Sequence, residues 1–148
     1  MSKFEDLIDK DKYQVFVFCC PALIPFNCFR HPWFVINKKG ETHIYEIGDL
    51  KINSSYLHID LRPLFKGIEY IRLFKNFLSK PILLGSIEGD VAEKVIEFIE
   101  NTKTNYPYCN KYSLLGPNSN TYLQWVLNKF PEFNIKLSWR FIGKNFNV

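Results

Sequence analysis

The sequence predicts a single α+β domain in which an antiparallel sheet packs against helices. A chain of 148 residues has the usual length of one domain, and no linker divides it, so we expect residues 1–148 to fold together. Hydrophobic residues make up 47% of the chain, which is enough to build a core and excludes a disordered protein. Segments with the composition of strands come first, and amphipathic helical segments follow them. This order is typical of a fold in which sheet and helices are segregated.

The first predicted strand covers residues 13–20, "YQVFVFCC", which are rich in β-branched and aromatic side chains and stop at Pro21. The uncharged stretch continues to Phe29, and a membrane-spanning helix is the alternative. This stretch only reaches the lower length limit of a span and contains two prolines. We therefore predict a buried strand, then an irregular loop, and no membrane span.

The segment "HPWFVINKKGETHIYEI" predicts a β-hairpin with a two-residue turn at residues 39–40. In this register Val35 lies opposite Ile44, and successive side chains alternate between the two faces of the sheet. One face then carries His31, Trp33, Val35, Ile44 and Glu46, and the other carries Phe34, Ile36, Tyr45 and Ile47.

The segment over residues 49–80 fits either an irregular connection or a helix at about residues 68–78, and the sequence leaves both open. The run "ILLGSIEG" after it predicts a short strand. A helix over residues 91–101 follows, because apolar residues recur there at helical spacing, and Asp90 with Glu93 resembles a capping box. The tail "IKLSWRFIG" suggests a last strand.

Charge and composition exclude several classes of function. Nineteen basic and 15 acidic residues are spread along the chain without a Lys/Arg cluster, so we interpret the net charge of +4 as favouring solubility and expect no nucleic-acid partner. The amino terminus lacks the pattern of a secretory signal, so we expect a cytoplasmic protein with four reduced cysteines. Phosphate-loop, dinucleotide and calcium-loop signatures are absent, and a zinc site from Cys20, Cys28 and His31 lacks a fourth ligand. We predict no cofactor and no metal.

The stretch "GPNSNTYLQWVLNKFP" is the candidate site. Ser119 or Asn120 is expected to cap a second helix that ends at Pro131, but one cap does not require four consecutive polar residues, Asn118 to Thr121. A helix start also directs free N–H groups and a positive dipole end at whatever lies there. Such a position suits a nucleophile, and a hydroxyl there needs a base to take its proton.

His31 is the histidine best placed to be that base. It opens a predicted strand, and Glu46 is its diagonal neighbour on the same face of the hairpin, close enough to orient an imidazole. His43 falls opposite Ile36, and His58 lies in the segment left open. The alternative for His31 is simple packing at the start of a strand.

The motifs "GPNSNTYLQWVL", "FIGKNF", "RHPWFVIN" and "YEIG" resemble an uncharacterised bacterial domain family whose hallmark is Gly-Pro-Asn-Ser-Asn-Thr-Phe. The resemblance runs from about Cys19 to Phe146, and it carries no activity with it.

A more remote similarity connects the chain to circularly permuted papain-like proteins of the NlpC type. In those proteins a histidine on an early strand precedes a cysteine at a helix start, and His31 and Ser119 occur here in the same order. The similarity implies a helix packed on an antiparallel sheet, and a hydrolase or acyltransferase that acts on amide or ester bonds of peptides or lipids. Ser119 stands where those proteins have the cysteine, so the domain is either a serine-type variant or inactive.

Three functions follow from these patterns. In the enzyme, Ser119 attacks a carbonyl, His31 takes the proton, Glu46 orients His31 and N–H groups near Asn120 hold the oxyanion. In the alternative, a non-catalytic module binds a peptide or a lipid-like molecule in the same cleft. The binding residues expected in either case are Asn118, Asn120, Thr121 and Trp33. A purely structural role instead predicts that backbone hydrogen bonds fully occupy Asn118 and Asn120. The sequence determines neither the substrate nor the oligomeric state.

Overall fold

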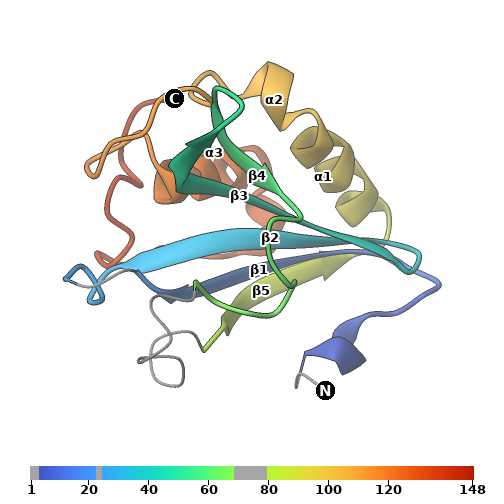
Figure 1. Ribbon diagram of the computed structural model, residues 1–148. Helices are drawn as coiled ribbons and strands as arrows, with labels where there is room; N and C mark the ends of the chain where they lie inside the picture. Colours follow the sequence, from blue (N-terminus) through green and yellow to red (C-terminus); the bar gives the residue numbers. More distant parts are fainter. Residues whose placement is uncertain (1–3, 23–24, 69–79) are drawn as a thin grey trace.

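The computed structural model describes residues 4–22, 25–68 and 80–148 and has the α+β fold (Figure 1). Its sheet contains five antiparallel strands in the spatial order β4-β3-β2-β1-β5. The strands are β1 (Tyr13–Pro21), β2 (Arg30–Lys38), β3 (Glu41–Ile52), β4 (Ser55–Ile59) and β5 (Ile82–Glu88). The α-helices are α1 (Asp90–Glu100), α2 (Thr102–Asn105) and α3 (Ser119–Lys129), and short 3-10 turns lie at η1 (Glu5–Leu7) and η3 (Pro131–Phe133).

The predicted first strand and hairpin are confirmed. Strands β2 and β3 pair with Val35 opposite Ile44, and Lys38 and Glu41 close the hairpin around a two-residue turn. Both turn residues have positive φ, 54° at Lys39 and 98° at Gly40, which is the backbone conformation that a tight hairpin with the right-handed twist of a sheet requires. The turn therefore fixes which side chains of the hairpin share a face.

The sheet separates two apolar layers, as the alternation predicted. Helices α1 and α3 cover one face, where Phe34, Ile36, Tyr45 and Ile47 join the main core (Figure 1). The opposite face carries a smaller cluster that includes Trp33, Val35 and Ile44. Phe4 and Phe65 belong to or pack on that second cluster, so the segment before β1 and the segment after β4 cover the face opposite α1 and α3.

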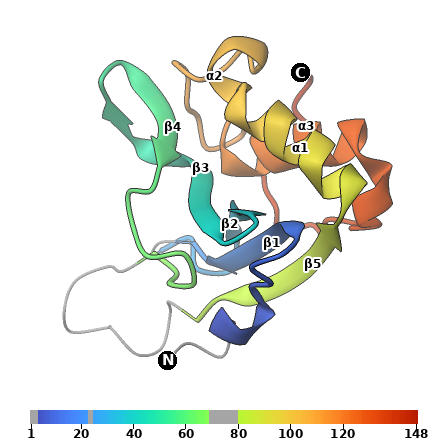
Figure 2. The same ribbon diagram turned by 90° about the vertical axis from the view of Figure 1, so that its right-hand side faces the viewer.

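A second hairpin, formed by β3 and β4, bends away from the other strands at the end that carries its turn. The register of β3 against β4 shifts between Ile47 and Ile52, and Figure 2 shows the far end of this hairpin rising toward α2. The Tyr56 N–H donates to the carbonyl of Cys109, 2.6 Å away, which ties that end to the loop before α3.

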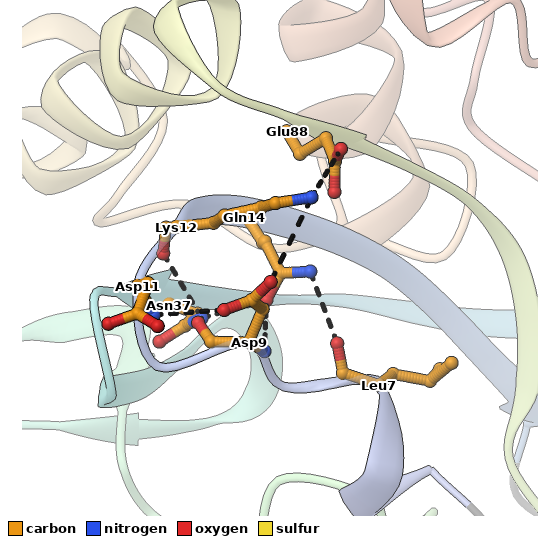
Figure 3. Close-up of polar contacts among 7 residues, drawn as sticks. All are labelled: Leu7, Asp9, Asp11, Lys12, Gln14, Asn37 and Glu88. Atoms are coloured by element: carbon orange, nitrogen blue, oxygen red, sulfur yellow. Dashed lines mark hydrogen bonds and ion pairs between the residues drawn. The ribbon is translucent and has the colours of Figure 1, made fainter.

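A buried polar cluster closes the hairpin end of β1 and β2 (Figure 3). The Asn37 side chain is fully buried, and its amide nitrogen donates to the carbonyl of Asp9 at 2.7 Å and to Gln14 Oε1 at 2.8 Å. Its oxygen accepts the Gly40 N–H at 2.7 Å, and Gln14 Nε2 donates to the carbonyl of Leu7 at 3.1 Å. These bonds fasten the chain before β1 to the sheet.

Two details of the helix starts differ from the prediction. No side chain caps α1, whose cap position is Gly89 with φ 75°, so Asp90 and Glu93 form no capping box. Asn118 caps α3, in place of Ser119 or Asn120. The four polar residues look equivalent in the sequence, and only the tertiary fold decides which of them leaves the helical conformation.

The predicted last strand is wrong. The tail after η3 forms no strand; instead, Leu137 and Phe141 are buried against the helical core, and the carbonyls of Ile142 and Gly143 accept side-chain bonds from the start of α3. The apolar residues that suggested a strand are thus anchors of an irregular segment. The alternative helix at residues 68–78 lies almost entirely outside the described residues.

In the part of the chain that the structure describes, the helices are all too short or too polar to cross a lipid bilayer. All four cysteines are free, and Cys19 and Cys20 are buried on opposite faces of the sheet, where they pack as small apolar side chains.

Candidate active site

A cavity of about 550 Å³ lies where the start of β2 faces the start of α3. It has the volume of a typical small-molecule site. His31, Glu46, Asn118, Ser119 and Asn120 all line it, so the structure brings together five of the seven residues that the sequence singled out.

The His31 and Glu46 side chains form a buried pair in this cavity. His31 Nε2 lies 2.7 Å from Glu46 Oε2, and both side chains are more than nine-tenths buried. A carboxylate only accepts hydrogen bonds, so Nε2 is the ring nitrogen that donates a proton to Glu46, and Nδ1 is the other ring nitrogen. Nδ1 has no partner among the described residues, and His31 lines the cavity. The pair therefore holds the imidazole in one orientation at the wall of the cavity.

Arg62 is a third member of this buried cluster, and it was not predicted from the sequence. Its Nη2 donates to Glu46 Oε2 at 2.7 Å and its Nε to Glu46 Oε1 at 3.1 Å, a two-point contact that suits a guanidinium. The guanidinium stacks on the indole of Trp33 at 4.2 Å, and Trp33 Nε1 donates to the carbonyl of Leu64. Arg62 comes from the irregular segment after β4, where no local pattern indicates a partner.

Burial raises the pKa of the Glu46 carboxyl, but the hydrogen bonds from His31 and Arg62 outweigh it and bring that pKa well below its ordinary value of 4.5. Glu46 therefore stays ionised, and it holds the imidazole in one tautomer and one orientation.

Asn118 builds the start of α3. Its Oδ1 accepts the N–H groups of Asn120 at 2.9 Å and Thr121 at 3.2 Å, and its own N–H donates to Thr121 Oγ1 at 3.1 Å. Its amide nitrogen reaches three carbonyls, those of Ser113, Leu114 and Ile142. Asn118 is thus fully occupied by bonds within the fold.

This cap decides which of the N–H groups near Asn120 remain without an acceptor among the described residues. The Asn120 N–H is occupied by Asn118 Oδ1, so it has no free direction toward the cavity. The backbone N–H of Ser119 has no acceptor among the described residues. It is the helix-start N–H that stays available for a developing negative charge.

Ser119 is the first residue of α3 and is 4% exposed. Its hydroxyl bonds no described residue, His31 included, and Ser119 lines the cavity. Asn120 Nδ2 donates to the carbonyl of Ile142 at 2.9 Å, while Asn120 Oδ1 is buried without a partner. The start of α3 therefore keeps polar atoms that the fold does not use.

Trp33 and Thr121, which were predicted to bind the ligand, do not line the cavity. Trp33 lies behind Arg62, and Thr121 Oγ1 donates to the carbonyl of Gly143 at 2.8 Å. Tyr112 lines the cavity although no pattern indicated it, and burial raises the pKa of its hydroxyl to about 12, so the hydroxyl stays protonated at neutral pH.

His58 also lines the cavity, and its Nε2 lies 2.7 Å from the carbonyl of Leu50. A Cβ at Gly48 would lie 2.3 Å from the His58 ring, so only glycine allows this ring its position. Among the described residues, no group of three or more His, Cys, Asp or Glu side chains is arranged to hold a metal ion.

The fold and cavity define an α+β domain with a buried, carboxylate-oriented histidine facing a helix start. Residues 13–146 match the family described as "Protein of unknown function (DUF3750)", and the chain belongs to that family. No curated protein and no solved structure matches the chain.

Proposed function

We propose that the cavity is the active site of a serine-type hydrolase or acyltransferase that acts on amide or ester bonds. The observation that carries this proposal is the 2.7 Å bond between His31 and Glu46, because it leaves Nδ1 as a base in the cavity that Ser119 also lines. The order of His31 and Ser119 along the chain, which is that of permuted papain-like proteins, supports the same assignment.

In the proposed reaction, Nδ1 of His31 takes the proton of Ser119 as Oγ forms a bond to the substrate carbonyl carbon. The Ser119 N–H stabilises the oxyanion. When the bond to the leaving group breaks, His31 gives that group the proton, and an ester on Ser119 remains. Water or another acceptor then attacks this ester with the same base, which restores Ser119. A substrate must first bring the hydroxyl and the imidazole into hydrogen-bond contact, a tightening that unliganded sites commonly require.

A fluorophosphonate probe tests this proposal without knowledge of the substrate, because it reacts with activated serines. We expect one adduct, which mass spectrometry of the digest places on Ser119. His31→Ala should slow labelling roughly 10²- to 10⁴-fold, the usual contribution of a general base. Ser138→Ala is the matched control, because Ser138 is exposed and outside the cavity, and it should label normally. Labelling that persists in Ser119→Ala would contradict the proposal.

The second candidate is a non-catalytic module that binds a peptide or a lipid-like molecule in the same cavity. The absence of a hydrogen bond between Ser119 and His31 favours it. It predicts that the fluorophosphonate leaves Ser119 unmodified under conditions in which the folded protein still retains a ligand in the cavity.

A further inference from the structure

Beside the cavity, the surface exposes a group of large apolar side chains that the proposed reaction does not use. We call this surface the rim and define it by Phe26, Leu114, Leu115 and Trp139. Trp139 is 68% exposed and Leu115 is 70% exposed, while Leu114 and Phe26 are each more than two-fifths exposed. Exposed apolar residues scattered singly are ordinary, but a contiguous group indicates a contact surface.

The members of the rim are contiguous in space, although they come from three segments. The Phe26 ring stacks near Phe29, whose ring meets Trp139 edge-on at 6.4 Å. The Arg30 N–H donates to the carbonyl of Arg140 at 2.9 Å, which joins the first and last segments. Figure 1 shows this junction, where the red C-terminal segment runs down beside the start of β2.

Leu114 and Leu115 connect the rim to two hollows. Leu114 lines the cavity of the candidate active site, and Leu115 lines a shallow groove together with Trp139. Ile142 lines both hollows and lies between them. The rim thus forms one side of the entrance to the cavity.

The last third of the chain, which supplies three of the four rim residues, has an excess of basic residues. Residues 101–148 contain six Lys or Arg residues and one acidic residue, Glu132, whereas residues 1–100 contain 13 basic and 14 acidic residues. Arg140 stacks over the Trp139 ring at 5.6 Å, and Arg30 lines the cavity. Two acidic residues line the cavity, Asp49 and Glu46, and Glu46 is paired with Arg62.

We propose that the rim docks on the surface of an anionic lipid bilayer and places the mouth of the cavity against the lipids. Exposed Trp and Leu side chains beside arginines suit the boundary between lipid headgroups and acyl chains, where indole rings prefer to lie. A nucleic acid would need basic residues along a track, and the exposed Leu115 side chain gives it no favourable contact. This docking does not depend on the chemistry at Ser119.

Sedimentation with vesicles tests the docking. The probe is vesicles of phosphatidylcholine alone or of phosphatidylcholine and phosphatidylglycerol in equal parts. We expect binding to the anionic vesicles that weakens with added salt. Arg140→Gln should weaken it about fivefold, the effect of one basic residue near an anionic surface. Leu115→Ser should weaken it roughly tenfold through lost apolar burial. The controls are Lys94→Gln and Ile82→Ser, which change exposed residues on α1 and β5 and should leave binding unchanged.

Tryptophan fluorescence locates the surface that enters the bilayer. Trp33 is buried and Trp125 is half-buried against Phe98, so a blue shift on vesicle binding should come from Trp139. The shift should disappear in Trp139→Phe while sedimentation persists. A shift that remains in Trp139→Phe, equal loss of binding in the controls, or binding to soluble polyanions without a shift would each overturn the proposal.

Discussion

The two ends of β2 both bury a polar cluster, but only one of the two clusters is complete. At the hairpin end, every polar atom of the Asn37 side chain is bonded within the fold (Figure 3). At the opposite end, His31 Nδ1, Ser119 Oγ and Asn120 Oδ1 are left without partners among the described residues. Of these three atoms, Asn120 Oδ1 is fully buried without a partner, a state that costs free energy and that a ligand in the cavity would relieve. The two ends of β2 thus differ in how completely the described part of the fold satisfies their polar side chains.

The largest effect should come from breaking the complete cluster. Asn37→Leu removes four hydrogen bonds at a fully buried position and leaves the N–H of Gly40 without its acceptor. We expect a loss of about 3 kcal/mol in the free energy of unfolding, measured with urea. Asn128→Leu is the control, because the exposed Asn128 pairs only with Gln124 one turn away on α3 and should change stability little. Equal losses in both variants would remove the distinction between the clusters.

Glu46→Gln probes the one charged pair of the incomplete cluster and should cost about 2 kcal/mol at neutral pH, because it leaves Arg62 without a countercharge. The folded-state pKa of Glu46 is depressed, so its ionisation stabilises the fold above the ordinary value of 4.5. As the pH falls below that value, the unfolded chain takes up the proton first, and the stabilisation is lost progressively.

The difference in the free energy of unfolding between the natural protein and Glu46→Gln should therefore become smaller as the pH falls below 4.5. Urea unfolding of both proteins at neutral pH and at several pH values below 4.5 measures it. A difference that does not change with pH would show that the charge of Glu46 contributes nothing to the stability of the fold.

The smallest effect on stability should come from the residue proposed to matter most for chemistry. Ser119→Ala removes a hydroxyl that bonds no described residue, so the free energy of unfolding should change by less than about 0.5 kcal/mol. The same variant should lose the fluorophosphonate adduct. A loss of stability as large as that of Asn37→Leu would place Ser119 with the structural residues.

The sequence predicted the parts of this site that local pattern controls. The two-residue turn at Lys39 and Gly40 set the register of the hairpin, and that register placed Glu46 beside His31. The contact of Arg62 with Glu46 was not predictable, because Arg62 lies in an irregular segment and no periodic sequence pattern indicates which residue it contacts.

Similar reasoning explains the errors. Asn118 was not distinguishable from Ser119 as the helix cap, because neighbouring polar residues share the same preference for that position. The tail after η3 has the composition of a strand, but its carbonyls bond to side chains of α3 and its apolar residues anchor to the core. The apolar composition of the tail indicates that its side chains are buried, but it does not indicate the hydrogen-bond partners of its backbone groups.

The tail also has a mechanical consequence. The carbonyls of Ile142 and Gly143 hold Asn118, Asn120 and Thr121, while Trp139, a few residues earlier, faces outward. The inner side of the segment from Trp139 to Gly143 is therefore bonded to the start of α3, the helix that carries Ser119. The outer side of the same segment is exposed to the surroundings. Any force that displaces this loop pulls directly on the first turn of α3. If binding on the outer surface displaces this loop and thereby changes affinity in the cavity, thermodynamic reciprocity requires that binding in the cavity changes affinity on the outer surface by the same factor.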